Sequence, residues 1–234
     1  VLGQSLSGSF AIETVVEEAT GEQLTVIVAD SVSVVFEADS GAGDDTAGMS
    51  LTNGFGAFVV SRAGVAGELN GSITAEFGSD FTVEGDLSLV TNTTNSSVSR
   101  EFTLGGRIYT LEVAAGPYFR FAGTGVSIDV LGQRITGDLS IERVVSLGDD
   151  NLPGGDGDNA DDVETLLTIG NAGLNLADGL LSLEDGEGIF LVTSDGVAGV
   201  VSGVISLGVE GASLGGAMRV EVNTSASAVN RTVQ

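Results

Sequence analysis

Apolar and polar residues alternate along most of this chain with a period of two. A phrase in which an apolar residue, a glycine and two further apolar residues occupy every second position occurs six times, beginning at Leu6, Leu69, Val83, Ile135, Val201 and Leu214. Side chains two positions apart on a strand lie on the same face. The intervening residues are mostly Ser, Thr, Asp, Glu or Arg. The pattern therefore predicts strands with one apolar face and one wet face.

Glycine falls on the apolar face in every copy of this phrase. A glycine within a strand usually marks a bulge, a bend or the close approach of another backbone. The sequence thus predicts a repeated bend or tight contact that shapes a rolled or stacked sheet. Small residues that merely fill a thin core would produce the same pattern.

The breaks in the alternation predict how the strands connect. Residues 24–28 and 32–36 form an apolar pair around Ala29-Asp30-Ser31, which favours a hairpin. Residues 69–77 and 81–90 favour a second hairpin, and residues 92–99 form a polar surface connection. From Phe102 to Ile141 the alternation is clean and the breaks are short, which favours an antiparallel meander. No stretch has a convincing helical period.

The chain contains a long internal repeat. The segment 56–67 returns 132 positions later as 188–199, and residues 1–4 return as residues 130–133. Gly85 and Asn92 return 131 positions later as Gly216 and Asn223. We therefore expect two β units, residues 1–129 and residues 130–234, of which the second is incomplete. The second unit carries an acidic loop at residues 146–162.

Together these patterns predict an all-β fold. We expect mostly antiparallel, glycine-rich strands in two tandem units that form an elongated, solenoid-like or rolled-sheet rod. The alternative is a pair of separate β-sandwich modules.

Charge and composition narrow the setting. The net charge is −25, with eight arginines and neither lysine nor histidine, so a nucleic acid or an anionic membrane is a poor partner. Self-repulsion on this scale suggests calcium-rich or saline surroundings. The absence of cysteine rules out a disulfide framework. The longest uncharged apolar segment, residues 196–209, is too short and glycine-rich to cross a bilayer as a helix.

The acidic loop offers the only candidate metal site that the spacing favours. Asp156, Asp158, Asp161 and Asp162 place hard oxygen ligands close together, and calcium takes such ligands. They do not match the EF-hand loop, and a solvated acidic loop is the alternative. Two weaker groups of the same kind are Glu37, Asp39, Asp44 and Asp45, and Glu184, Asp185 and Glu187.

Catalysis by this chain would have to rely on carboxylates, because His, Cys and Lys are absent. A carboxylate-based hydrolase needs only two acids at a set separation. No pair stands out from the acidic background, so we expect no enzyme activity. Five glycosylation sequons, at Asn70, Asn92, Asn95, Asn223 and Asn230, are expected by chance in a chain this rich in Ser and Thr.

In its tandem β units, Gly-Asp-rich loops, lack of cysteine and phrases such as Gly137-Asp138-Leu139-Ser140-Ile141, the chain resembles the giant acidic repeat proteins that microbes secrete as adhesins, surface fibres and matrix components. The resemblance implies a structural role outside the cell or on its surface, as a spacer or assembly scaffold. The implied partners are neighbouring repeats or copies of the same chain. The alternative is a calcium-dependent module that binds a glycan or a surface receptor.

Overall fold

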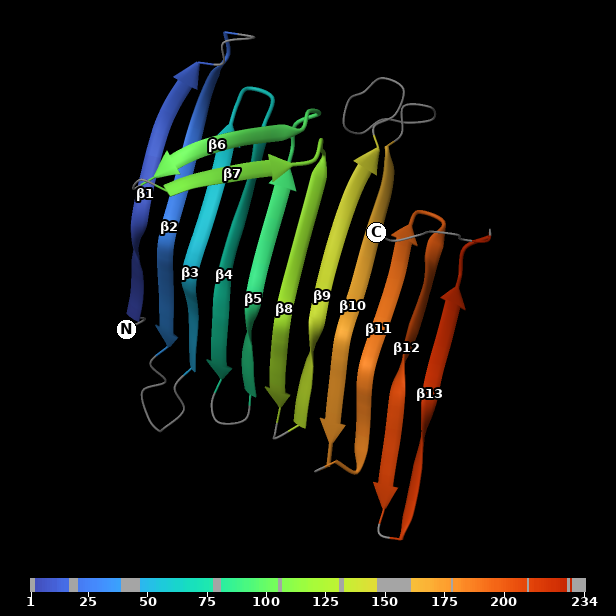
Figure 1. Ribbon diagram of the computed structural model, residues 1–234. Helices are drawn as coiled ribbons and strands as arrows, with labels where there is room; N and C mark the ends of the chain where they lie inside the picture. Colours follow the sequence, from blue (N-terminus) through green and yellow to red (C-terminus); the bar gives the residue numbers. More distant parts are fainter. Residues whose placement is uncertain are drawn as a thin grey trace. The chain divides into compact units, whose positions relative to one another are not determined.

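The computed structural model consists of strands and connecting turns (Figure 1). It describes residues 3–16, 21–38, 47–77, 81–104, 107–130, 133–146, 161–177, 179–209, 211–226 and 228. Within these ranges no residue belongs to a helix, and so none forms a helix long and apolar enough to span a membrane. The predicted all-β class is confirmed, and every recorded strand pair is antiparallel.

The chain divides into two compact units, Val1–Leu131 and Gly132–Gln234. The strands of unit 1 are β1 (Gly3–Val16), β2 (Gln23–Ala38), β3 (Ala47–Val60), β4 (Val65–Phe77), β5 (Phe81–Asn92), β6 (Val98–Leu104), β7 (Arg107–Val113) and β8 (Tyr118–Val130). Those of unit 2 are β9 (Gln133–Ser146), β10 (Asp162–Leu176), β11 (Leu181–Thr193), β12 (Gly196–Val209) and β13 (Ala212–Asn223).

Unit 1 is a sheet with a hairpin laid across it. Strands β1 to β5 pair in sequence order, and β8 then pairs with β5. Strands β6 and β7 pair only with each other in the parts that the structure describes, and they cross one face of the sheet (Figure 1). We call the side under this hairpin the hairpin face and the other side the open face.

Unit 2 is a simple meander. Each of β9, β10, β11, β12 and β13 pairs with the next, so the strands lie side by side in sequence order.

The predicted hairpin of residues 69–77 and 81–90 in unit 1 is confirmed as β4 and β5.

Two of the predicted strand breaks are wrong, because both are bulges within one strand. Residues 24–28 and 32–36 lie on the single strand β2, and Ser31 adopts a left-handed φ of 53° between them. The pairing with β3 jumps there from Ala29 opposite Gly56 to Val32 opposite Gly54. The other is the predicted break at Gly123-Thr124-Gly125, one of the short breaks between Phe102 and Ile141; strand β8 runs through it, and Gly125 has a φ of 59°. A bulge adds one residue to one strand without reversing the chain.

The predicted meander from Phe102 to Ile141 is also wrong. Strand β7 does not continue into β8 as a neighbour; instead, β8 pairs with β5, for example Leu89 opposite Phe121. The hairpin β6–β7 is thus inserted between two strands that are neighbours in the sheet. The alternation in this segment does correspond to strands, but the hairpin that they form packs on the face of the sheet and does not extend its edge.

The glycines of the recurrent phrase lie where another backbone comes close, as predicted. A Cβ on Gly85 would lie 3.1 Å from the Cα of Val126, and one on Gly137 would lie 3.2 Å from the Cα of Ala172. Gly216 is the exception, since no atom lies within 4 Å of the place of its Cβ. Close approach across bulges therefore explains most of these glycines better than the filling of a thin core.

Some of the tightest contacts occur twice. A Cβ on Gly67 would collide with the ring of Phe58 and lie 2.6 Å from the carbonyl oxygen of Ala57. A Cβ on Gly199 would collide with the ring of Phe190 and lie at the same 2.6 Å from the carbonyl oxygen of Ile189. The positions differ by 132 residues in each case, so the repeated sequence carries repeated packing.

A repeated backbone feature explains one of the weaker acidic groups. Asp185 lies in a bulge of β11 with a φ of 50°, and Asn53, at the corresponding place in β3, has a φ of 54°. Asn and Asp adopt left-handed φ more readily than other residues that have a side chain. The bulge therefore accounts for Asp185 without a bound metal ion.

Candidate functional site

The best-packed part of unit 1 lies beneath the hairpin. Leu111 of β7 is fully buried, and Val113 is 3% exposed. The ring of Phe55 on the sheet stacks on that of Tyr109, with centroids 4.7 Å apart. The buried members of this cluster are Leu24, Ala57, Val59, Leu111 and Val113. The hairpin thus closes a small core against β2 and β3.

Asn92 ties both ends of the hairpin to the sheet. It is the last residue of β5 and is 0% exposed. Its Nδ2 donates to the carbonyl oxygen of Ser96, at 2.8 Å, and to that of Ala114, at 2.6 Å. Its Oδ1 accepts from the backbone N and the Oγ1 of Thr94, at 2.8 and 2.7 Å. We call this set the asparagine junction, because one side chain holds the chain before β6 and after β7.

The repeat places Asn223 at the corresponding end of β13 in unit 2. Its Oδ1 accepts from the backbone N and the Oγ of Ser225, at 2.9 and 2.7 Å, as Asn92 does from Thr94. Thr224 and Val197 form a backbone hydrogen bond of 2.8 Å. Asn223 differs from Asn92 in being exposed to solvent. Unit 2 therefore repeats the turn of the asparagine junction, but Asn223 is not buried as Asn92 is beneath the hairpin of unit 1.

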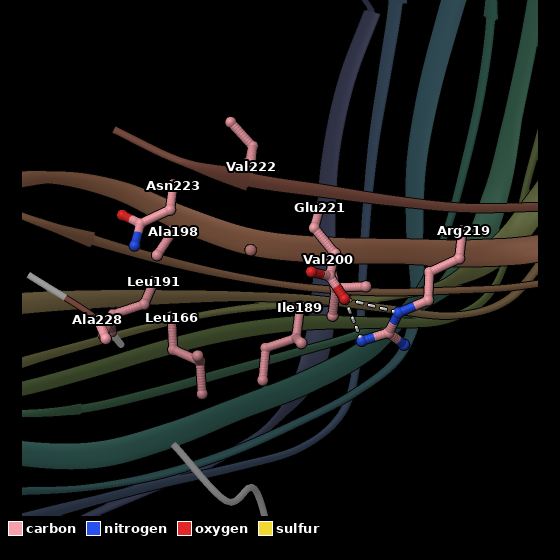
Figure 2. A pocket seen from close by; sticks show the side chains of 11 residues that line it. Leu166, Ile189, Leu191, Ala198, Val200, Arg219, Glu221, Val222, Asn223 and Ala228 are labelled. Atoms are coloured by element: carbon pink, nitrogen blue, oxygen red, sulfur yellow. Dashed lines mark hydrogen bonds and ion pairs between the residues drawn. The ribbon is translucent and has the colours of Figure 1, made fainter. Parts of the chain in front are cut away.

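A recess of about 610 Å³ opens beside Asn223 (Figure 2). Its floor consists of side chains from four neighbouring strands, namely Leu166, Ile189, Leu191, Ala198, Val200 and Asn223. The registers match those of β2 to β5, because Leu191 lies opposite Leu166 and Ala198, as Val59 lies opposite Val26 and Ala66. This floor, which we call the unit 2 floor, corresponds to the surface that the hairpin covers in unit 1.

Each of these surfaces carries one glutamate, but the two glutamates do not occupy equivalent strands. In unit 1, Glu68 on β4 lies opposite Val90 on β5. In unit 2 the equivalent pair is Val200 on β12 opposite Glu221 on β13. Glu221 accepts from the Nε of Arg219 at 2.8 Å, and this ion pair lies at the rim of the recess (Figure 2).

The position of Glu68 affects its ionisation. It lies in the same row of the hairpin face as buried Ala57, and burial raises the pKa of its carboxyl group above the ordinary 4.5. The folded state therefore holds this proton to a higher pH than the unfolded state does.

We expect the stability of unit 1 to fall as pH rises through the range just above 4.5, because the unfolded chain loses the Glu68 proton first. Glu68→Gln removes this loss, so its melting temperature should exceed that of the wild type at pH 7. The two should melt alike near about pH 3, where the carboxyl group is protonated in both the folded and the unfolded chain. Both tyrosines, Tyr109 and Tyr118, lie in unit 1, so tyrosine fluorescence follows its unfolding.

Glu76→Gln, at an exposed position of the same strand, is the control for this variant. It removes the same charge from a carboxyl group that water already solvates, so it should not reproduce the gain at pH 7. A lower melting temperature for Glu68→Gln than for the wild type at pH 7 would refute the expectation.

The predicted calcium ligands are divided by the limits of the described chain. Asp156 and Asp158 lie outside the described residues. Asp161 immediately precedes β10 and Asp162 is its first residue, opposite Ser146. Across the described ranges no group of three or more acids comes together in a metal-binding arrangement. The calcium site therefore remains a prediction, as does the acidic group in residues 37–48, of which 39–46 also lie outside.

A sequence signal for the asparagine junction exists, but the sequon pattern obscured it. The polar composition of residues 92–99 predicts a surface connection, yet Asn92 is buried and bonded at both ends of its amide. The useful signal is the recurrence of Asn followed by two hydroxyl residues at 92–94 and 223–225. Glycosylation of Asn92 would require the junction to open, because the Nδ2 of this side chain is buried and donates two hydrogen bonds.

We also call the side of unit 2 away from the unit 2 floor its open face, and the open face of each unit is apolar. In unit 1, β1 presents Leu6, Phe10 and Ile12, which are 66%, 54% and 70% exposed. Other exposed apolar residues of the open faces are Phe36, Met49 and Phe119 in unit 1, and Ile135, Ile141, Ile205, Leu207, Leu214, Val220 and Val222 in unit 2. Among the described residues no second layer of strands covers either open face.

Comparisons with protein-family models, curated proteins and solved structures found no match to this chain. The case for its function therefore depends on the geometry of its own surfaces.

Proposed function

We propose that this chain is a structural segment of an extracellular or cell-surface fibre, adhesin or matrix protein. Its units act as spacers in an elongated, rod-like array and join neighbouring repeats or other copies of the chain. No catalytic step is assigned to it. The observation that carries this proposal is the apolar open face of each unit, which has exposed Leu and Ile side chains in both units and exposed Phe side chains in unit 1.

Exposure on this scale supports an assembly role for a physical reason. Soluble monomers rarely expose contiguous apolar patches of more than a few hundred Å², and larger patches mark interaction surfaces. Two such faces packed together would bury Leu6, Phe10 and Ile12 at about 25 cal/mol per Å² of apolar area. A flat sheet face fits another sheet face better than it fits a small ligand.

The edge strands support the same role. Among the described strands, β1 pairs with one neighbour in unit 1 and β13 with one in unit 2, so each of them is an edge strand there. An exposed edge strand can pair with another chain. The repeated contacts of Gly67 and Gly199 indicate that one set of packing rules is reused along the chain, which suits a spacer.

The net charge of −25 sets the conditions for such assembly. Like charges on approaching copies repel each other, and salt or divalent cations screen this repulsion. Association through the open faces should therefore increase with ionic strength. Saline or calcium-rich surroundings outside the cell satisfy this requirement.

Sedimentation velocity over a range of protein and salt concentrations tests the proposal. We expect the wild type to associate at high salt and the variant Leu6→Glu with Ile12→Glu to remain monomeric. The control, Ser7→Glu with Ser9→Glu, adds the same charge to the other side of β1, at exposed positions. It should associate like the wild type. Monomeric behaviour of all three chains, or equal association of all three, would refute assembly through the open face.

A further inference from the structure

Unit 2 has a surface that is covered in unit 1. The unit 2 floor repeats the strands, the register and the terminal asparagine of the surface on which β6 and β7 lie. In unit 1 the counterparts Val26, Ala57 and Val59 are 5%, 1% and 5% exposed, and the hairpin packs on Ala57 and Val59. In unit 2, Leu166, Ile189 and Leu191 keep part of their surface accessible and line an open recess.

The sequence after the two asparagines is also repeated. Val98 and Arg100, at the start of β6, return 131 positions later as Val229 and Arg231. Counterparts of unit 1 residues extend to Thr103, which aligns with Gln234. Residues 229–234 thus correspond in sequence to the opening of β6, residues 98–103.

We propose that the unit 2 floor is the docking site for a second β-hairpin built like β6–β7. The occupant is a two-stranded segment that lays alternate aliphatic side chains on Leu166, Ile189 and Leu191, beside the turn that Asn223 holds at the end of β13. This inference does not depend on assembly through the open face, because the unit 2 floor is on the other side of the sheet.

The geometry of the asparagine junction supports this occupant over a small ligand. Asn223 already holds the turn that leads away from β13, with Ser225 in the role of Thr94. In unit 1 the Nδ2 of Asn92 donates to the carbonyl oxygens of Ser96 and Ala114, one on each side of the hairpin. An asparagine at the end of a strand, above an aliphatic floor, is the arrangement that anchors a hairpin in this chain.

The floor also limits which hairpin fits. Ile189 stands where unit 1 has Ala57, and Glu221 stands where unit 1 has Val90. The occupant must therefore leave more room over β11 than β7 does over β3. It must also place a polar or cationic group near Glu221 and Arg219.

The test extends the full chain by the remaining part of a hairpin. Residues 104–117 are appended after Gln234, and backbone hydrogen exchange is followed by mass spectrometry. We expect amides of β11, β12 and β13 to exchange at least about tenfold more slowly than in the chain without the extension, because docking suppresses local opening. A second extended chain carries Ile189→Ala, which restores the small residue of unit 1.

Matched controls separate docking from the mere presence of extra residues. An extension with Asp in place of the residues copied from Leu111 and Val113 should give no protection. Asn223→Ala in the extended chain should remove most of it. If the extended chain and its Ile189→Ala variant both exchange like the original chain, the proposal is wrong. The association of the chain at high salt is measured separately, so failure of one proposal leaves the other testable.

Discussion

Replacing Asn92 with alanine should destabilise unit 1 by about 3 kcal/mol, because the change removes the four hydrogen bonds of a buried side chain. The carbonyl oxygens of Ser96 and Ala114 would lose their donor, and the backbone N of Thr94 would lose its acceptor. Each buried polar group left without a partner costs about 1–3 kcal/mol. Water that enters the gap would recover part of this loss, which is why the expected total is below the sum.

Urea unfolding followed by tyrosine fluorescence measures this loss, since both tyrosines lie in unit 1. The matched control is Asn223→Ala, which removes the same side chain from an exposed position. Hydrogen exchange of β12 and β13 should show a destabilisation below about 1 kcal/mol for that variant. If Asn92→Ala cost no more than Asn223→Ala, the junction would not be what fastens the hairpin to the sheet.

Leu111→Ala should be similarly costly, at about 3 kcal/mol, because it leaves a cavity at the centre of the cluster under the hairpin. Leu111 is 0% exposed and packs with Ala57 and Val59. The loss has a second effect that Asn92→Ala shares, namely weaker attachment of β6 and β7. We therefore expect faster hydrogen exchange throughout the hairpin.

The control for this variant is Ile108→Ala on the same strand. Ile108 is 70% exposed. Its truncation should therefore change the free energy of unfolding by less than about 0.5 kcal/mol. Urea midpoints of the two variants, read from tyrosine fluorescence, decide the matter. Comparable losses at positions 108 and 111 would mean that the hairpin is held by its own pairing and not by the cluster beneath it.

Alternation alone predicted the strands, because a period of two survives wherever one face differs from the other. It did not predict how they continue past a bulge. At Ser31 and Gly125 one residue turns left-handed and the strand goes on, yet the local composition matches that of a turn. A bulge and a tight turn use the same residue types. Strand pairing between distant segments is what separates them.

The covered face could not be predicted from the alternation. Glu68 and Asn92 occupy positions that the alternation assigns to solvent, and both lie on the hairpin face. The aliphatic phrase around Gly71 and Gly85 lies on the open face, where its side chains keep some exposure. The hairpin that reverses this expectation comes from residues far along the chain. The local alternation of apolar and polar residues does not indicate which face of the sheet a distant hairpin packs on.

The glutamate of the hairpin-binding surface is Glu68 in unit 1 and, one strand further on, Glu221 in unit 2. This difference matters in a chain made of similar units. Similar segments in one polypeptide can exchange partners during folding and trap wrong pairings. Neighbouring strands are about 4.8 Å apart. Each glutamate therefore places its charge where the other unit has a valine, Glu68 where unit 2 has Val200 and Glu221 where unit 1 has Val90. A hairpin copied from unit 1 would lie over Glu221 in unit 2 where it lies over Val90 in unit 1, so each surface favours a different hairpin while both keep the same backbone plan.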